Sequence, residues 1–278
     1  MFVVSKSKGI KMKKKIALAC LCGAAILASQ GAMASGIKVR GGATNNDYTL
    51  DVTPATGSAY TYAKSSFSGK NLGLTWLMDD STYLDFALSN GSGNWDGTYT
   101  NGTGFSSTMT RDDSAIILGS TSVTSGGSAT NLYFGWKTGE TKLDRAPQTI
   151  TLANPYNTNS SLSFKTSGLV FGGGLGIPAG GGTVGLSLGM GIMSGQYDTT
   201  RNTSTTTATT TPNKADMAFG FSYGIGYTYS FTPNFGVSVD YKGNIYNYTF
   251  NVGQTGTNGE WSLNEKFNTT GVSAYLKF

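Results

Sequence analysis

The chain has 278 residues and contains 40 Gly, 15 Tyr and 14 Phe, but only 6 Pro. Charged residues make up 13% of it, about half the share of an ordinary soluble domain. The mean hydropathy of −0.16 argues against a bundle of membrane helices. A chain that is poor in charge and yet not hydrophobic overall fits a wall with one apolar face and one polar face.

Residues 1–34 are predicted to be a cleaved secretory signal. Basic residues Lys11 and Lys13 to Lys15 precede an apolar run from Ile16 to Ala28, and Ala32-Met33-Ala34 fits a small-x-small cleavage site. The apolar run is too short to span a bilayer as a helix, which needs about 20 residues. Residues 35–278 are then expected to form one domain.

Removal of the signal changes the charge of the chain. The precursor carries 20 basic and 15 acidic residues and has a pI of 9.0, but six of the Lys residues lie in the signal. The mature part keeps 14 basic and 15 acidic residues, a net charge of −1. We therefore expect no nucleic-acid partner, because the basic character belongs to the export signal.

Period-two alternation is the recurring pattern of the mature chain and predicts β-strands. In the segment 217–231 the odd positions are large and apolar or aromatic, while the even positions are small or polar. This pattern exceeds the usual strand of about 5–6 residues and suits a tilted strand that crosses a membrane. Ten strands are predicted: 36–45, 67–78, 82–91, 106–118, 128–139, 162–177, 183–197, 215–231, 235–249 and 265–278.

Short and long connections alternate between these strands, as in an up-and-down barrel with short periplasmic turns and long extracellular loops. The short turns are predicted at 79–81, 119–127, 178–182 and 232–234. The long polar connections are predicted at 46–66, 92–105, 140–161, 198–214 and 250–264. Region 106–127 decides the count, because a loop there would leave eight strands instead of ten.

The last strand carries apolar residues at alternate positions and ends on an aromatic residue. These residues are Val272, Ala274, Leu276 and Phe278. This ending resembles the C-terminal assembly signal of bacterial outer-membrane β-barrels, and the export signal and the Gly and aromatic content extend the resemblance over the whole mature chain. The resemblance implies an all-β transmembrane antiparallel barrel in the outer membrane, in contact with lipid and lipopolysaccharide, that is inserted by the barrel-assembly machinery.

Aromatic residues near the strand ends are expected to form two girdles at the membrane surfaces. The predicted girdle residues are Trp76, Tyr83, Phe231, Phe235 and Phe278 at the periplasmic side and Trp136, Tyr197 and Phe219 at the outer side. A soluble β-sandwich also alternates, but it buries its apolar face and seldom has such long strands with a Tyr-rich face.

Along each strand, the residues that alternate with the apolar, lipid-facing ones are expected to face the lumen. The candidate lumen-lining residues are Lys38, Arg40, Asp85, Arg111, Asp113, Lys137, Asp240, Lys242 and Lys277. Charged groups in a narrow interior must pair with one another or stay hydrated. The set therefore predicts either a ladder of ion pairs that fills a closed barrel or a narrow aqueous path.

The chemistry of common enzymes is missing from the sequence. The chain has no His, and its two Cys lie in the predicted signal, so neither a Ser-His pair nor the usual Zn site can form. Ser187 and Ser222 lie in G-x-S-x-G matches, but both are inside alternating strands rather than at a strand-to-helix turn. No catalytic residue, metal or cofactor is predicted.

Two functional hypotheses remain. The first is a small porin-like channel for small solutes. It is favoured by the charged residues at the positions expected to face the lumen and by the small residues of the wall. The second is a closed barrel that serves as a structural anchor or adhesin through its surface loops, favoured by the Thr-rich segment 199–212. A barrel enzyme is disfavoured, because the outer-membrane phospholipases and omptin proteases of the superfamily rely on His.

Overall fold

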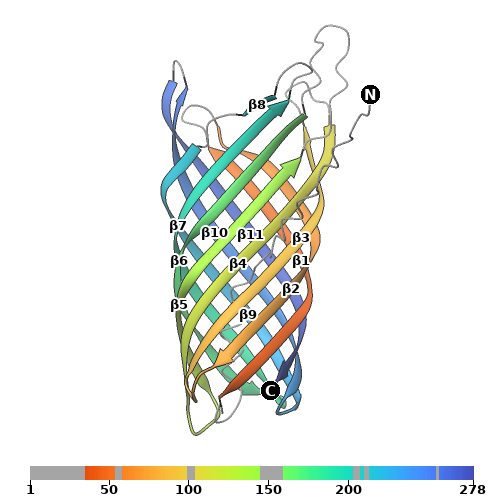
Figure 1. The fold of residues 1–278 in the computed structure, drawn as a ribbon, viewed down its shortest axis with the longest axis vertical. Coiled ribbons are helices and arrows are strands. Elements are labelled where there is room, and N and C mark those ends of the chain that lie inside the picture. Colours follow the sequence, from red (N-terminus) through yellow and green to blue (C-terminus); the bar gives the residue numbers. More distant parts are fainter. Residues whose placement is uncertain are drawn as a thin grey trace, which may run out of the picture.

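The computed structural model describes residues 35–53, 58–98, 104–144, 159–202, 207–209, 213–254 and 257–278. The predicted signal, residues 1–34, lies outside the described residues. Among the described residues, no helix is long and apolar enough to cross a membrane. The strands are antiparallel and run obliquely around a tall cylinder (Figure 1).

Ten long strands and one short one make up the sheet. They are β1 (Gly36–Thr53), β2 (Tyr60–Leu77), β3 (Thr82–Thr98), β4 (Gly104–Val123), β5 (Ala129–Asp144), β6 (Asn159–Ala179), β7 (Gly182–Asn202), β8 (Thr207–Thr209), β9 (Asn213–Thr232), β10 (Phe235–Gln254) and β11 (Thr257–Lys277). Each long strand pairs with its neighbours in sequence, β1 pairs with β11, and β7 pairs with both β6 and β9. The wall is therefore a closed ten-stranded barrel, which leaves no long unpaired edge.

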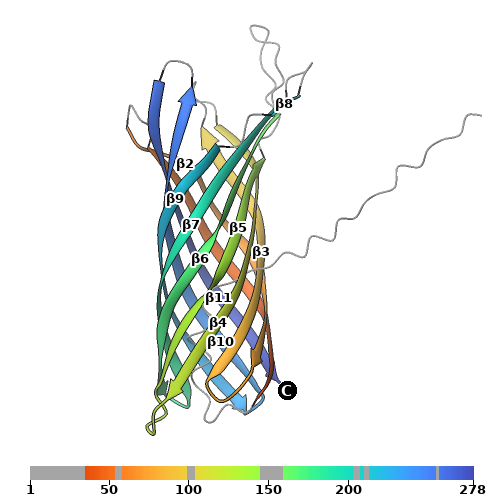
Figure 2. The ribbon, with the colours of Figure 1, turned by 60° about the vertical axis from the view of Figure 1, so that its left-hand side comes forward.

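One end of the barrel gathers both ends of the sheet and the tight turns. The backbones of Ile37 and Phe278 exchange two hydrogen bonds there, of 3.1 and 2.8 Å. The β6–β7 hairpin turns through Gly180 and Gly181, whose φ angles of 55° and 80° place both in the left-handed region that favours glycine. We call this end the turn end and the opposite one the loop end; Figure 2 shows the C-terminus at the turn end and β8 at the loop end.

The structure settles the strand count at ten, because region 106–127 is not a loop. Strand β4 covers residues 106–123 without a break, and the turn is confined to residues 124–128. The strands extend well into the predicted long connections, so those expected boundaries were wrong. Residues 46–53 continue β1, for example, and residues 199–202 of the Thr-rich segment continue β7.

The outer face of the turn half is apolar. Its exposed side chains form a continuous belt around the wall, and examples from five strands are Leu74, Leu118, Phe134, Met190 and Val272. Strands of about 20 residues, tilted by about 40°, reach about 50 Å, whereas the apolar band of a membrane barrel is about 25 Å tall. Only about half of this barrel therefore carries a surface suited to lipid.

The outer face of the loop half is polar. Its side chains are bonded to one another across neighbouring strands, as in the ion pairs Lys266–Asp51 (2.9 Å) and Lys165–Asp198 (3.1 Å). Such a surface suits water rather than acyl chains. The change from apolar to polar occurs at the same height on adjacent strands, between Ile116 and Ser114 on β4 and between Trp136 and Thr138 on β5.

The predicted girdle residues separate into two groups. Trp76, Trp136, Phe219, Phe231, Phe235 and Phe278 are exposed on the outer face. Tyr83 and Tyr197 are corrections, because both point into the barrel. Tyr83 has the same parity as the inward Asp85, and Tyr197 has the opposite parity to the outward Ile192, so closeness to a strand end was the wrong criterion.

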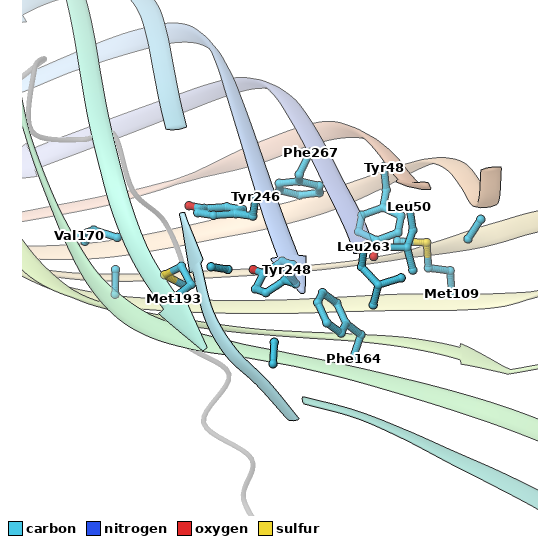
Figure 3. Close-up of a cluster of buried hydrophobic side chains, with 14 of the residues drawn as sticks. Tyr48, Leu50, Met109, Phe164, Val170, Met193, Tyr246, Tyr248, Leu263 and Phe267 are labelled. Carbon is cyan, nitrogen blue, oxygen red and sulfur yellow. The ribbon is translucent and has the colours of Figure 1, made fainter. Parts of the chain in front are cut away.

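The core of the barrel is concentrated in the loop half. Its buried side chains are large and apolar, and Figure 3 shows Leu50, Met109, Phe164 and Leu263 gathered in the interior from different strands. In the turn half, the interior is more polar: Thr75, Asp85 and Ser238 are buried there beside apolar residues such as Leu77 and Ile117. The polarity of the wall is therefore inverted between the two halves: the turn half is apolar outside and more polar inside, and the loop half is polar outside and apolar inside.

Candidate functional site: the barrel lumen

The lumen of the turn half holds a bidentate ion pair between β1 and β3. Arg40 donates from Nη1 to Asp85 Oδ1 at 2.6 Å and from Nη2 to Asp85 Oδ2 at 2.8 Å. Thr75, on the strand between them, donates its hydroxyl to the same carboxylate at 2.6 Å. Beside this group, the Lys38 Nζ lies 3.9 Å from the centre of the Tyr275 ring. The Asp85 carboxylate therefore has both a charged partner and a hydroxyl donor inside the barrel.

The middle of the lumen is crossed by a second, more deeply buried network. Arg111 on β4 donates from Nη2 to Asp113 Oδ1 at 2.7 Å and from Nε to Asp113 Oδ2 at 3.0 Å. Its Nη1 donates to Thr141 on the neighbouring β5 at 2.7 Å and also to Glu265 on β11. Strands β3, β2 and β1 separate β4 from β11 in the sheet, so the contact with Glu265 joins different sides of the lumen.

Aromatic rings close around this network. Arg111 lies 5.3 Å from the centre of the Phe267 ring, and Lys137 lies 5.4 Å from the centre of the Tyr246 ring. The three charged residues of the network are only 1–4% exposed, namely Arg111 at 3%, Asp113 at 4% and Glu265 at 1%. These buried groups therefore lie across the axis of the barrel.

Small wall residues make room for the large side chains of the lumen. A methyl group on Gly220 of β9 would overlap the ring of Tyr246, and one on Gly189 would lie within 2.6 Å of the Ser222 hydroxyl and closer still to that of Tyr133. The Gly-rich wall therefore compensates for bulky neighbours in a narrow barrel rather than widening a path.

No protein-family model and no curated protein sequence matches the chain. Solved structures of outer-membrane proteins do match. The outer membrane protease OmpT from Escherichia coli aligns with a TM-score of 0.58 at 9% identity, over 89% of this chain and 99% of that one. OprG from Pseudomonas aeruginosa aligns with a TM-score of 0.42 at 13% identity, over 90% and 98% of the two chains. The translocator domain of NalP from Neisseria meningitidis aligns with a TM-score of 0.45 at 12% identity, over 91% of this chain and 92% of that one.

This chain has the fold of the outer-membrane β-barrels. At these identities the likeness concerns the fold alone, so the protease activity of OmpT is not carried over. Ser187 and Ser222, the serines of the G-x-S-x-G matches, lie within β7 and β9 and not at a turn. Within the described ranges, no group of acidic residues, His or Cys could hold a metal ion.

The structure brings together several of the charged residues predicted to line the lumen. Arg40 meets Asp85, Arg111 meets Asp113, and Lys242 lies 3.0 Å from Asp240. Lys38, Lys137, Asp85, Arg111, Asp113 and Asp240 are buried, whereas Lys277 is half-buried near the turn end beside Lys38.

Sequence reasoning missed one member of the central network, Glu265. Its parity on β11 is that of Lys277, which was predicted to face the lumen, so a strict count along the strand would have found it. The aromatic residues that cover the network were also missed. Tyr246 and Phe267 have inward parity, but large aromatic residues were taken to mark the lipid face.

Proposed function

We propose that this outer-membrane barrel is closed and non-catalytic, and that it anchors a rigid folded platform at the cell surface. The observation that carries this proposal is the Arg111–Asp113–Glu265 network across the lumen. This choice favours the anchor hypothesis over the porin-like channel, although both were compatible with the sequence.

The energetics of the network support a closed lumen. Moving Arg111 aside would break charge-assisted hydrogen bonds to two carboxylates and one hydroxyl, and it would leave Asp113 and Glu265 buried without their cation. Removing one partner of such a group costs about 3–5 kcal/mol. A ten-stranded barrel is also little wider than the side chains that fill it.

The loop half supports the role of a platform. It combines a polar outer face with a core of buried residues such as Trp95, Phe164 and Leu263, which is the arrangement of a water-soluble β-barrel. Because it continues the transmembrane strands without a break, it would stand rigidly above the membrane.

Export and assembly complete the proposal. The signal over residues 1–34 would direct the chain across the inner membrane, and the turn end would face the periplasm. Val272, Ala274, Leu276 and Phe278 are exposed on the outer face of β11, where an assembly factor can reach them. The surrounding outer-membrane lipid and lipopolysaccharide would contact the apolar belt.

Electrical recording of purified protein in planar bilayers tests the closed lumen. The native protein should give no discrete conductance steps, and the triple variant Arg111→Ser, Asp113→Ser, Glu265→Ser should give a measurable conductance. The control Asp51→Ser, Lys266→Ser removes an ion pair from the outer face of the same half and should stay silent. Regular conductance steps in the native protein would overturn the proposal and restore the channel for small solutes.

A deletion tests the surface role separately. A variant without residues 203–212 spares β7 (Gly182–Asn202), so it should keep the barrel folded, as judged by its heat-dependent mobility on gels. It should lose binding of the whole cells to a surface ligand. Unchanged binding would show that this segment is not the contact surface.

A further inference from the structure

An apolar cup lies inside the barrel at its loop end, above the central network. Its cavity has a volume of about 160 Å³. The lining comes from six strands on different sides of the barrel: Leu50, Val52, Tyr62, Leu162, Phe164, Tyr197, Phe250, Trp261 and Leu263. Figure 3 shows Leu50, Leu263 and Phe164 among the side chains that gather there.

The lining of the cup contains no charged residue. Its only polar side-chain atoms belong to two Tyr and one Trp, and the remaining surface is aliphatic or aromatic. An enclosed apolar cavity of about 150 Å³ binds a molecule of the size of benzene, and the cup has a similar volume but is open on one side. Water would gain few hydrogen-bond partners in the cup, whereas an apolar ring would gain dispersion contacts on several sides.

The rings of the cup hold one another in place. Tyr197 packs edge-on against Phe250 with ring centres 5.3 Å apart, and Phe164 packs edge-on against Tyr248 at 5.0 Å. Tyr62 stacks on Trp95 at 6.1 Å. Because such contacts fix the rings before any ligand arrives, the cup is preformed and loses little side-chain entropy on binding.

The position of the cup separates it from the lipid. The outer wall at this height carries charged pairs such as Lys266–Asp51, so acyl chains of the bilayer do not reach it. Tyr62, Leu162, Tyr197 and Trp261 are only partly buried, which leaves the cup accessible from the loop end. Phe164 and Leu263, by contrast, are buried, and they form its deep part.

We propose that the cup binds one small apolar molecule of single-ring size, such as a benzene with short alkyl substituents. This site goes beyond the anchor role and does not depend on whether the lumen conducts. The volume selects the size of the ligand, and the uncharged aromatic lining selects its chemistry.

Fluorine NMR with fluorobenzene as the probe tests the proposal on the full mature protein in lipid nanodiscs. Empty nanodiscs of the same lipid give the non-saturable partitioning that must be subtracted. The native protein should add one saturable site per barrel. Titration curves that match those of empty nanodiscs would overturn the proposal.

Two substitutions of Leu by Trp, one inside the cup and one on the lipid face, form a matched pair. Leu263→Trp fills the deep part of the cup and should abolish the saturable site. Leu188→Trp places the same ring in the lipid-facing belt on β7, where Leu188 is 61% exposed, and should leave binding unchanged. Equal binding by both variants would place the site elsewhere and overturn the proposal.

A third variant guards against loss of the fold in Leu263→Trp. Leu162→Ala enlarges the cup at its accessible side and should create saturable binding of 1-fluoronaphthalene, which the native protein should lack. If Leu162→Ala, like the native protein, does not bind 1-fluoronaphthalene, the cup is not the binding site and the proposal is overturned. Binding of fluorobenzene only after deletion of residues 145–158 would also overturn it, because the natural occupant would then be part of this chain.

Discussion

The two halves of this barrel use the same strands in opposite ways. On β11, the outward residues are Val272 and Leu276 near the turn end, but Ser262 and Lys266 near the loop end. The inward residues change in the other sense, since Ser273 of the turn half gives way to Leu263. Even-numbered residues face outward along the whole of β11, but the surroundings of the outer face and of the interior change between the two halves.

This inversion shows what holds each half together. In the turn half, lipid surrounds the wall, so the interior can be polar provided that its charges are paired. In the loop half, water surrounds the wall, so stability depends on burying apolar side chains inside, as in a soluble barrel. The Arg111 network lies between the polar and the apolar parts of the interior, and substitutions placed on either side of it should behave differently.

The largest effect is expected from Arg111→Ala. It leaves Asp113 and Glu265 buried without a cation, which should lower the free energy of unfolding by about 3–5 kcal/mol. Urea unfolding in lipid vesicles, followed by tryptophan fluorescence, measures the loss. The triple variant Arg111→Met, Asp113→Ala, Glu265→Leu is the control, and it should recover much of that loss because no buried charge remains.

A similar loss for the triple variant and for Arg111→Ala would contradict this account. It would mean that the volume of the side chains, rather than the pairing of their charges, holds the middle of the barrel together.

A second comparison places the same substitution on one strand in both halves. Phe164→Ala removes a fully buried ring from the core of the loop half and should cost about 3 kcal/mol. Phe171→Ala removes a ring that is 40% exposed on the lipid face of β6 and should cost clearly less. Unfolding in vesicles measures both, and an equal cost would show that the loop half has no separate core.

A third comparison adds a charge to the outer face. Val272→Lys puts an ammonium group into the apolar belt and should cost about 2 kcal/mol or more, since the penalty for Lys at the middle of a bilayer is about 2–4 kcal/mol. Ser262→Lys makes the same charge on the same face, ten positions along β11, and should be nearly neutral. A substantial cost at Ser262 would place the lipid boundary higher than the polar surface indicates.

The sequence was sufficient for the antiparallel barrel and favoured ten strands, because alternation recurs along the chain, but the structure was needed to exclude eight. It was not sufficient for strand length. Residues 46–53 alternate as well as any segment, with Tyr48, Leu50 and Val52 on one parity. These apolar residues point inward, whereas Ile37 and Val39 on the same strand point outward. An interpretation that assigns every apolar face to lipid therefore ends the strand too early.

The site could be predicted only in part, for the same reason. The inward orientation of Arg111 and Asp113 follows from their alternating positions along β4, and that of Glu265 could have been found in the same way on β11. The contact between Arg111 and Glu265 spans 154 positions and depends on how the sheet closes, which no local pattern records. Tyr83 and Tyr197 were assigned to the girdles because aromatic residues suit both a membrane surface and a buried core.

The smallest effect is expected from the ion pair on the outer face of the loop half. Lys266 donates to Asp51 at 2.9 Å, and this hydrogen bond holds the pKa of Asp51 below its ordinary value. The charged form is thus favoured by folding, so its contribution is present above about pH 4 and is lost as the pH falls through the depressed pKa. Because both side chains are partly exposed, the contribution should stay below about 1 kcal/mol and should shrink in high salt. Unfolding of the native protein and of Asp51→Asn between pH 2 and pH 7 measures it as a difference that closes toward low pH; a difference that is constant over this range would show that the pair adds nothing to stability.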